Sequence, residues 1–189
     1  MAEASGTPLS AKARQLISIA AGTLVSFGLA AGLHFLWSIA GGFLPVALFA
    51  AVNESVWEHV KILSWGFAAW SLIEYRILLP DTRRYLVARV AGVVTVILLT
   101  ICFFYIYSGI LGFSVVWVDI VSAALWLLVG ELVTMRLLNS PSDIGRLFPV
   151  AAALAALLAV MLLCFTASPP KLGLFRDPVT GLYGLETMP

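Results

Sequence analysis

Five long apolar stretches, separated by short polar breaks, constrain the fold of this chain more than any other feature. Each holds about 20 residues or more, and an α-helix of that length crosses the roughly 30 Å hydrocarbon core of a bilayer. The stretches cover residues 15–40, a run that starts within residues 53–61 and ends at 79, and residues 85–107, 115–138 and 147–166. The sequence therefore predicts an all-α membrane protein with a bundle of five transmembrane helices.

The composition agrees with this interpretation. Hydrophobic residues make up 61% of the 189-residue chain and charged residues 11%, whereas soluble domains are about 45–50% apolar and about 25% charged. The mean hydropathy is +1.03, so the lipid bilayer is the expected partner. The formal net charge of +1 provides no basic surface for nucleic acid. An oligomer and a complex with a partner membrane protein are both compatible with this composition.

Three regions follow from the apolar pattern. We expect a cytoplasmic tail over residues 1–14, a transmembrane domain over 15–167 and an extracytoplasmic segment over 168–189. Residues 41–52 are too short to span a bilayer, and they contain two glycines and a proline. This stretch is predicted to be an interfacial or re-entrant segment between the first two helices.

The basic residues predict the orientation. With the N-terminus inside, eight of them fall on the inner side: Lys12, Arg14, Arg76, Arg83, Arg84, Arg89, Arg136 and Arg146. Three fall on the outer side: Lys61, Lys171 and Arg176. Because cytoplasmic loops carry an excess of Lys and Arg, we expect a multi-pass protein of the plasma membrane with its N-terminus cytoplasmic and its C-terminus extracytoplasmic.

The motif NESVWEHVK, residues 53–61, opens the second predicted helix. Ser55 and Glu58 have the spacing of a capping box, in which each side chain bonds the backbone N–H of the other. Asn53 is an alternative cap. Lys61 is expected to extend towards the membrane surface or to pair with Glu58. Capping therefore accounts for most of this polar run.

Capping does not account for His59. Counted inward from the helix ends, His34, His59 and Asp119 lie at similar depths near the outer face, with Glu54 and Glu58 just above them. Two imidazoles and carboxylates suit a divalent metal such as zinc, which predicts a site made by His34, His59, Asp119 and Glu54. The alternatives are acid–base catalysis by His59, Asp119 and Glu58, an interhelical hydrogen-bond network, and a path for protons or a solute.

Two further carboxylates, Glu74 and Glu131, fall in the inner halves of the second and fourth predicted helices. Arg76 and Arg136 follow them at spacings that do not suit pairs within one helix, so any pairing is expected between helices. These residues are predicted either to join helices by hydrogen bonds or to continue a polar route for protons or cations inward.

The C-terminal sequence PPKLGLFRDPVTGLYG combines turn residues with apolar ones. Asp177 and Pro178 favour a turn, and Gly181 follows them. We expect an ordered segment, folded over the outer mouth of the bundle as a lid or a strap. Asp177 or Arg176 could then reach the histidines, and Tyr183 belongs to the same polar region.

Several motifs, in order along the chain, resemble a bacterial family of small multi-pass membrane proteins that is catalogued as a domain of unknown function. They are HFLW, NESVWEH within AVNESVWEHVKIL, IEY, FFYIYSGILG with VDI, and LFRDPVTGLYG. The resemblance covers His34 to Gly184 and implies a fold but no activity, substrate or cofactor. Its motifs include Asn53, Glu54, Ser55, Trp57, Glu58, His59, Asp119, Asp177, Pro178, Gly181 and Tyr183. Glu131 departs from it, because the family is associated with a glutamine there.

Three functions are compatible with these observations. The first is a membrane enzyme, metal-dependent or acid–base, acting on a lipid or envelope substrate. The second is a protein that binds or transports a small solute, coupled to protons. The third is a structural or accessory membrane subunit.

Overall fold

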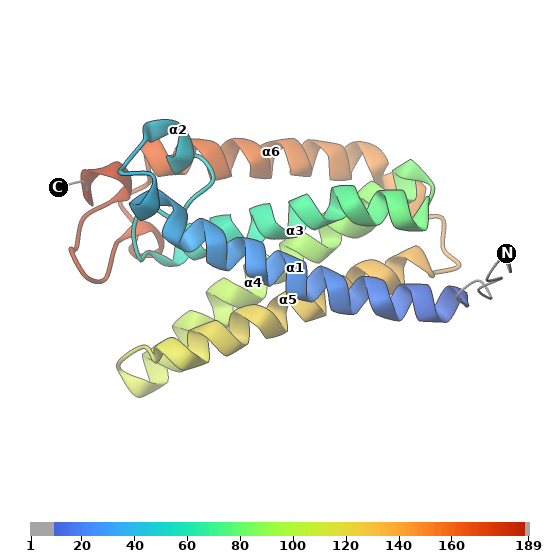
Figure 1. Cartoon of the computed structure of the whole chain (residues 1–189), viewed down its shortest axis with the longest axis horizontal. Coiled ribbons are helices and arrows are strands. Elements are labelled where there is room, and N and C mark those ends of the chain that lie inside the picture. Colours follow the sequence, from blue (N-terminus) through green and yellow to red (C-terminus); the bar gives the residue numbers. More distant parts are fainter. Residues whose placement is uncertain (1–9, 188–189) are drawn as a thin grey trace, which may run out of the picture.

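The computed structural model describes residues 10–187, and this part of the chain is almost entirely helical. The helices are α1 (Ala11–Ile39), α2 (Leu44–Ala47), α3 (Val56–Leu78), α4 (Thr82–Leu111), α5 (Val116–Leu138) and α6 (Phe148–Ala167), with short 3-10 helices η1 (Ile144–Leu147), η2 (Gly173–Phe175) and η3 (Gly184–Thr187). The five long helices run along the long axis of the molecule, and the start of α1 and η3 lie at opposite ends of it (Figure 1). Residues 1–9 of the predicted N-terminal tail lie outside the described part.

The helix ends follow from local sequence signals. Ser55 is the N-cap of α3, and its side chain accepts from the Glu58 backbone N–H at 3.3 Å. Pro80 follows α3, and Asp81 caps α4 by accepting from the Arg84 N–H at 2.8 Å. Gly112, with φ +80°, ends α4 in the left-handed conformation that glycine favours. The polar breaks in the sequence thus become the connections between helices.

Four helices in residues 10–187 are long and apolar enough to cross a membrane, at Lys12–Ile39, Thr82–Leu111, Val116–Leu138 and Ile144–Ala167. The predicted all-α membrane architecture is therefore confirmed at the level of four candidate spans. Helix α3 has 23 residues, but Glu58, Lys61 and Glu74 make it more polar than the others. It packs mainly against α1 and α4.

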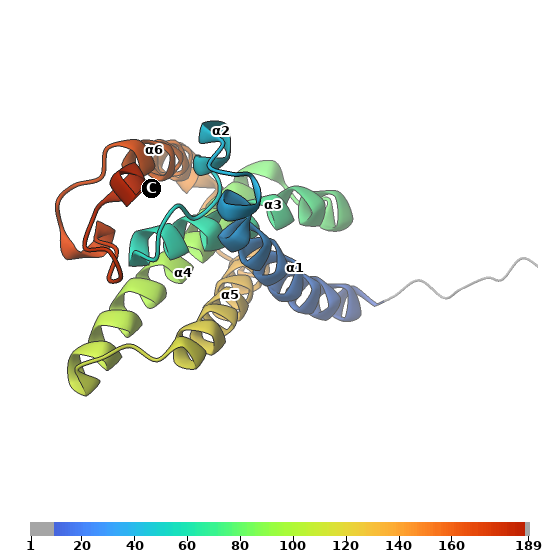
Figure 2. The same cartoon turned by 60° about the vertical axis from the view of Figure 1, so that its left-hand side comes forward.

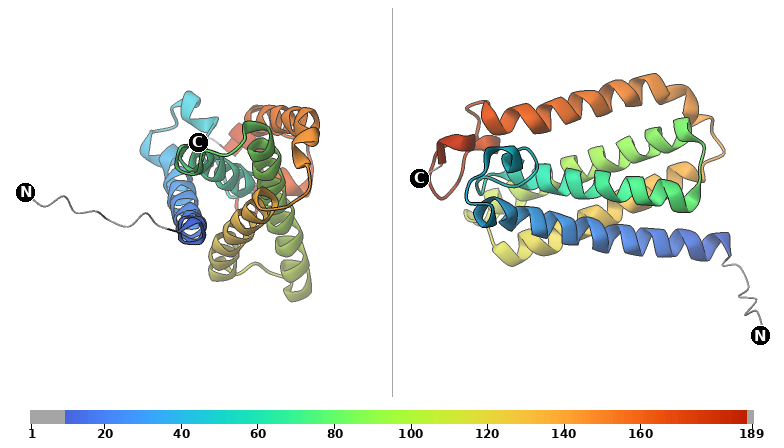
Figure 3. Two further views of the ribbon diagram at one scale, coloured as in Figure 1. Left: turned by 90° about the vertical axis from the view of Figure 1, so that its right-hand side faces the viewer. Right: turned by 45° about the horizontal axis from the view of Figure 1, so that its top comes forward.

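The arrangement places α3 between α1 and α6. An end-on view and a tilted view both show α1 and α6 on opposite sides of the bundle with α3 between them (Figure 3). The hairpin end of α4 and α5 stands apart from the remaining helices (Figure 2). Short α2 occupies the predicted interfacial segment, after Gly41 and Gly42 turn the chain with φ of +60° and +75°.

Small residues allow the helices to approach closely. A Cβ added at Gly66 of α3 would clash with the Ser26 carbonyl of α1, and one added at Gly92 of α4 would lie 2.8 Å from the Gly130 carbonyl of α5. Close backbone approach is a common way for helices to associate in membranes, where apolar burial alone gives little preference for protein over lipid. These glycines therefore fix α3 against α1 and α4 against α5.

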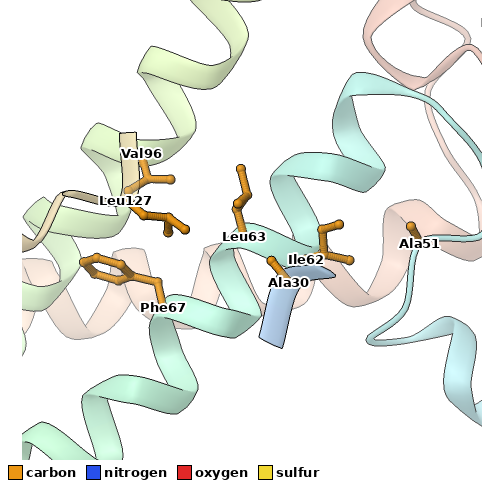
Figure 4. Packing of buried hydrophobic residues seen from close by; sticks show 7 residues of the cluster. All are labelled: Ala30, Ala51, Ile62, Leu63, Phe67, Val96 and Leu127. Atoms are coloured by element: carbon orange, nitrogen blue, oxygen red, sulfur yellow. The ribbon is translucent and has the colours of Figure 1, made fainter. Parts of the chain in front are cut away.

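An apolar layer fills the middle of the bundle. Phe67 of α3 packs towards Val96 of α4 and Leu127 of α5 (Figure 4). The same cluster continues along α3 to residues near the loop that precedes the helix. Its buried members are Ala30, Ala51, Ile62, Leu63, Phe67, Val96 and Leu127.

The C-terminal segment is ordered and packs on the ends of α3 and α6. The Phe175 ring lies 5.1 Å from that of Trp57 and 5.3 Å from that of Phe165. Asn53 donates from Nδ2 to the Gly184 carbonyl at 3.2 Å, so the segment is also tied to the loop before α3. Buried contacts therefore attach the C-terminal segment to the helical bundle.

Candidate metal site

A short loop between α2 and α3 presents Glu54 to the end of α1. The Ala51 N–H donates to the Leu33 carbonyl at 3.3 Å, which attaches the loop to α1. Asn53 accepts from the Ser55 N–H at 2.9 Å and stabilises the turn just before the helix. The chain between these two attachments contains Glu54, whose side chain is 49% exposed. The loop therefore directs a carboxylate towards the last turns of α1.

Glu54 meets both histidines of the chain. Its Oε2 lies 3.5 Å from His34 Nε2 and 3.7 Å from His59 Nε2. The two imidazole rings have centroids 5.2 Å apart, and one ligand atom from each of the three residues lies within 4.8 Å of the others. Ligand atoms of tetrahedral zinc, with bonds of about 2.0–2.2 Å, lie about 3.3–3.6 Å apart. The carboxylate is close to that spacing from both rings.

His59 forms a hydrogen bond with Ser55 on the side of its ring that faces away from Glu54. This bond determines which ring nitrogen carries the proton. His59 Nδ1 lies 2.9 Å from the Ser55 carbonyl, which can only accept, so Nδ1 carries a proton. In the neutral ring, Nε2 then has a lone pair directed towards the carboxylate oxygen. Two acceptors facing each other require a proton or a cation between them. A backbone carbonyl behind a histidine is also the usual way to orient a metal ligand.

His34 is held differently. Its Nδ1 is buried and has no hydrogen-bond partner in the described part of the chain. Its ring packs edge-on against Phe35, with centroids 5.0 Å apart. The polar contact that orients it is the one with Glu54, whose hydrogen bond with His34 lowers the pKa of the Glu54 carboxyl. The carboxylate is therefore ionised at neutral pH and available as a ligand.

The cluster is accessible from outside. The side chains of His34 and His59 are 27% and 37% exposed, so an ion and water can reach their Nε2 atoms. Three protein ligands with one position open to water are typical of catalytic zinc sites, whereas structural sites are closed by four. The arrangement can therefore hold a metal and keep a water molecule on it.

Of the four residues predicted for the metal, the structure brings together His34, His59 and Glu54 but not Asp119. The Asp119 carboxylate accepts instead from the Tyr107 hydroxyl, which also accepts from the Val115 N–H at 3.1 Å. These bonds close the turn between α4 and α5. Equal depth along the bundle did not mean proximity, because this hairpin end diverges from α1 and α3 (Figure 2).

Glu58, a candidate for acid–base catalysis, lies in a buried ion pair. Its Oε2 is 2.6 Å from Lys61 Nζ and accepts from the Val52 N–H at 3.0 Å. Lys61 also donates to the Ala47 carbonyl at 2.8 Å and to Thr166 Oγ1 at 2.7 Å. Of the capping box only the Ser55 half forms, because Asn53 takes the Ser55 N–H. Glu58 and Lys61 therefore connect α2, α3 and α6 and do not reach the histidines.

Residues of the C-terminal segment also have other partners. Asp177 is buried and accepts from the Val179 N–H and the Thr180 hydroxyl, each at 2.8 Å. Arg176 donates to the Gly181 carbonyl at 3.2 Å, and Lys171 lies over the Tyr183 ring at 5.3 Å. Asp177, Arg176 and Tyr183 stabilise the fold of the segment, and none of them bonds to a histidine.

The carboxylates of Glu74 and Glu131 both pair with one arginine on another helix. This agrees with the predicted pairing between helices, although the arginine is neither Arg76 nor Arg136. Arg89 Nη1 lies 3.1 Å from Glu74 Oε2 and 2.7 Å from Glu131 Oε2, and all three side chains are buried. Arg89 was counted among the inner-side charges, so the sequence interpretation missed its role. Arg89 lies seven residues, or about 10 Å, beyond the start of α4. This depth was the sequence signal that Arg89 belongs inside the bundle.

No curated protein and no solved structure matches the chain. A family model described as "Family of unknown function (DUF6512)" matches residues 9–185. This match covers nearly the whole chain and agrees with the resemblance that its motifs predicted. The chain belongs to the DUF6512 family, a family of unknown function.

Proposed function

We propose that this chain is an integral membrane protein that binds one divalent transition metal ion, zinc by its donor set, at the end of the bundle where α1 ends and α3 begins. The observation that carries the proposal is the convergence of His34, Glu54 and His59 with their ligand atoms within 4.8 Å. Imidazole and carboxylate ligands in this ratio occur in zinc hydrolases. The His59 tautomer and the ionised carboxylate both favour a cation between them.

The reaction we propose is hydrolysis by a metal-bound water molecule. A zinc ion bound at this site would lower the pKa of a water molecule on it to about 7 and so would supply a nucleophile at neutral pH. His34, His59 and Glu54 would hold the metal, and the exposed side of the cluster would admit the substrate. Because the cluster lies at the end of a membrane bundle, a lipid or another envelope component is the substrate class that can reach it.

Five crossings of the membrane agree best with this architecture. Helices α1 and α4 run in the same direction along the bundle (Figure 1), so the chain must return across the bilayer between them. Only α3 is available for this return. Its charged residues Glu58, Lys61 and Glu74 are buried, as intramembrane charges require, and exposed Arg76 lies in its last turn. We therefore propose that α3 is the second transmembrane helix.

The orientation proposed from the basic residues becomes stronger once buried charges are removed from the count. Arg89 and Lys61 lie inside the bundle and do not belong to loops. Seven basic residues then remain on the inner side and two on the outer side. We propose a cytoplasmic N-terminus, a transmembrane domain and an extracytoplasmic C-terminal segment in the plasma membrane, with the metal site at the outer face.

A continuous route for a transported solute receives less support. The cluster around Arg89 and the histidines at the outer end are separated by the apolar layer of Ile62, Leu63 and Phe67 (Figure 4). The ion pairs of Glu58 and Arg89 join helices, which is the role expected of structural polar groups. Neither observation favours transport over metal binding.

Metal content tests the proposal directly. The protein is purified with a tag that contains no histidines, stripped of metal with a chelator and reloaded with zinc. We expect it to retain about one zinc ion per chain, measured by elemental mass spectrometry. His34→Ala and His59→Ala should each weaken zinc binding by more than about 100-fold, since even the loss of an outer partner of a ligand costs about 10–100-fold. Asp119→Asn, the matched control, should keep the metal. Equal zinc content in wild-type and His59→Ala protein would refute the site.

The pH dependence of zinc binding should report two histidines. Histidine must be neutral to bind a metal, so the affinity for zinc should fall as the pH is lowered and the two imidazoles take up protons. Two ligands predict a loss approaching about 100-fold per pH unit, measured by competition with a chelator between pH 5 and 8. The lowered pKa of the Glu54 carboxyl keeps it ionised in this window. A flat profile would contradict ligation by the histidines.

A further inference from the structure

A wide groove runs between α3, α4 and α6, with a cavity volume of about 1190 Å³. Helix α6 is fixed to α3 at its C-terminal end, where Thr166 binds Lys61 and the Phe165 ring packs 5.4 Å from that of Trp57. It is fixed to α4 nearer its start, where Ala151 packs with Val87 and Val90. Between these attachments α6 stands away from α3 and leaves the groove open to the side.

The groove is separate from the candidate metal site. Its lining residues all come from α3, α4 and α6, whereas the metal site is made by α1, the loop before α3 and the first turn of α3. Helices α1 and α6 lie on opposite sides of α3 (Figure 3). A ligand in this groove would therefore be a second ligand of the protein and not the substrate held at the histidines.

The walls of the groove are apolar, and its deeper polar groups already have partners. Leu72, Val93 and Leu158 are among the lining side chains. At the floor, Ser71 donates to the Phe67 carbonyl at 2.8 Å and accepts from Arg89 Nε at 2.8 Å. A polar solute would lose its hydration there without gaining hydrogen bonds in return. The interior of the groove suits hydrocarbon.

The two ends of the groove differ in charge. At the end where α3 stops and α4 starts, Arg76 lines the groove. Arg76 is exposed and has no ion-pair partner in residues 10–187. Tyr75 and Thr82 also line the groove, and their hydroxyls lie 2.7 Å apart. A cation without a partner at the mouth of an apolar groove complements an anionic head group with a hydrocarbon tail.

The groove is slightly longer than one leaflet of a bilayer is thick. Along α3 it extends from Ser64 to Ile77, and 13 residue steps of about 1.5 Å give about 20 Å. One leaflet contributes about 15 Å, half of the roughly 30 Å hydrocarbon core. Ligand pockets usually have volumes of about 300–1,000 Å³, so this cavity is large enough for lipid chains. The basic mouth lies at the surface of the leaflet, and the apolar end reaches just past the midplane.

We propose that this groove is a binding site for an anionic phospholipid. An acyl chain of the lipid lies along α3, α4 and α6, and its phosphate binds Arg76. The lipid belongs to the leaflet at the end of the bundle where α3 ends, opposite the histidines. Its chain supplies the apolar contacts that α6 does not make with α3.

Quenching of Trp65, which lines the groove, tests the proposal. The protein is reconstituted into vesicles containing brominated phosphatidylglycerol or brominated phosphatidylcholine, and Trp65→Phe protein is subtracted to isolate the Trp65 signal. We expect the apparent affinity of wild-type protein for the anionic lipid to be about fivefold higher, the factor for one basic residue at a membrane surface. Arg76→Gln should remove the preference. Arg83→Gln, an exposed arginine at the same end outside the groove, should retain it.

A second variant separates the site from the general lipid shell. Ala159→Trp should fill the groove and reduce quenching of Trp65 by both lipids, with Ala159→Trp/Trp65→Phe protein subtracted to remove the signal of the added tryptophan. Circular dichroism and gel filtration should show an intact monomeric fold. Equal quenching by the two lipids in wild-type protein would overturn the proposal. So would an unchanged preference in Arg76→Gln, or a wild-type dimer that Ala159→Trp dissociates, because a second copy would then occupy the groove.

Discussion

Replacing Arg89 by methionine is expected to lower the free energy of unfolding by about 3–5 kcal/mol, the usual cost of removing one partner from a buried ion pair. Among residues 10–187, Arg89 is the one cation that pairs with the two buried carboxylates of Glu74 and Glu131. It also donates to the Phe67 carbonyl at 2.9 Å, and its guanidinium lies over the Phe67 ring at 3.8 Å. Without it, two carboxylates remain inside the bundle with no counter-charge. Titration with sodium dodecyl sulfate in mixed micelles measures the change.

Glu131→Gln is the matched control for this variant. One carboxylate oxygen of Glu131, Oε1, is buried without a hydrogen-bond partner in the described chain, and the other accepts from Arg89. Glutamine keeps an acceptor for Arg89 and removes a negative charge that the cluster does not balance. We expect its effect to stay within about 1 kcal/mol of wild type, as for many single substitutions.

Glu74→Gln should cost more than Glu131→Gln. Both oxygens of Glu74 are used, since Oε1 accepts from the Ser18 hydroxyl at 2.7 Å and Oε2 accepts from the Tyr85 hydroxyl at 3.0 Å in addition to Arg89. An amide nitrogen at either position would face a donor. If Arg89→Met and Glu131→Gln destabilise the protein equally, the charge argument is wrong and the cluster acts through packing alone.

The transmembrane pattern was the part of the fold that the sequence predicted best. The stretch predicted at 85–107 corresponds to α4 at Thr82–Leu111, and the one at 147–166 to α6 at Phe148–Ala167. These helices could be recognised because they are apolar over most of their length. Helix α3 is different, since a central helix can contain charged residues when its neighbours supply the partners. Hydropathy alone underestimates such a helix.

The candidate site was predicted in part, for a geometrical reason. Depth counted along helices is reliable to about a turn, and it placed His34 and His59 near each other with Glu54 above. Depth contains no information about position across the bundle, and this is why Asp119 was included. The pairing of Lys61 with Glu58 was one of two alternatives predicted from their spacing, and it is present. The further partners of this pair could not be predicted, because Thr166 and Ala47 are distant in the sequence and contact it only after α6 and α2 have packed.

The second large effect that we expect concerns the buried ion pair of Lys61 and Glu58. Lys61→Met should lower the free energy of unfolding by about 3–5 kcal/mol, because it leaves the Glu58 carboxylate buried without its cation. The Lys61 and Glu58 side chains are 0% and 2% exposed. Glu58→Gln combined with Lys61→Met should recover much of the loss, since replacing both partners of a buried pair is often close to neutral. Lys171→Met, which breaks the exposed pair with Glu186, should cost less than about 1 kcal/mol.

Zinc binding should fall together with stability in Lys61→Met. Glu58 accepts from the Val52 N–H, two residues before Glu54, so the ion pair supports the loop that presents the carboxylate to the histidines. The unfolding titration and the zinc competition are therefore measured on the same preparations. If Lys61→Met unfolds at the wild-type detergent fraction, the buried pair does not stabilise the bundle. If it is destabilised but binds zinc with unchanged affinity, the loop is held by its contacts with α1 and the C-terminal segment instead.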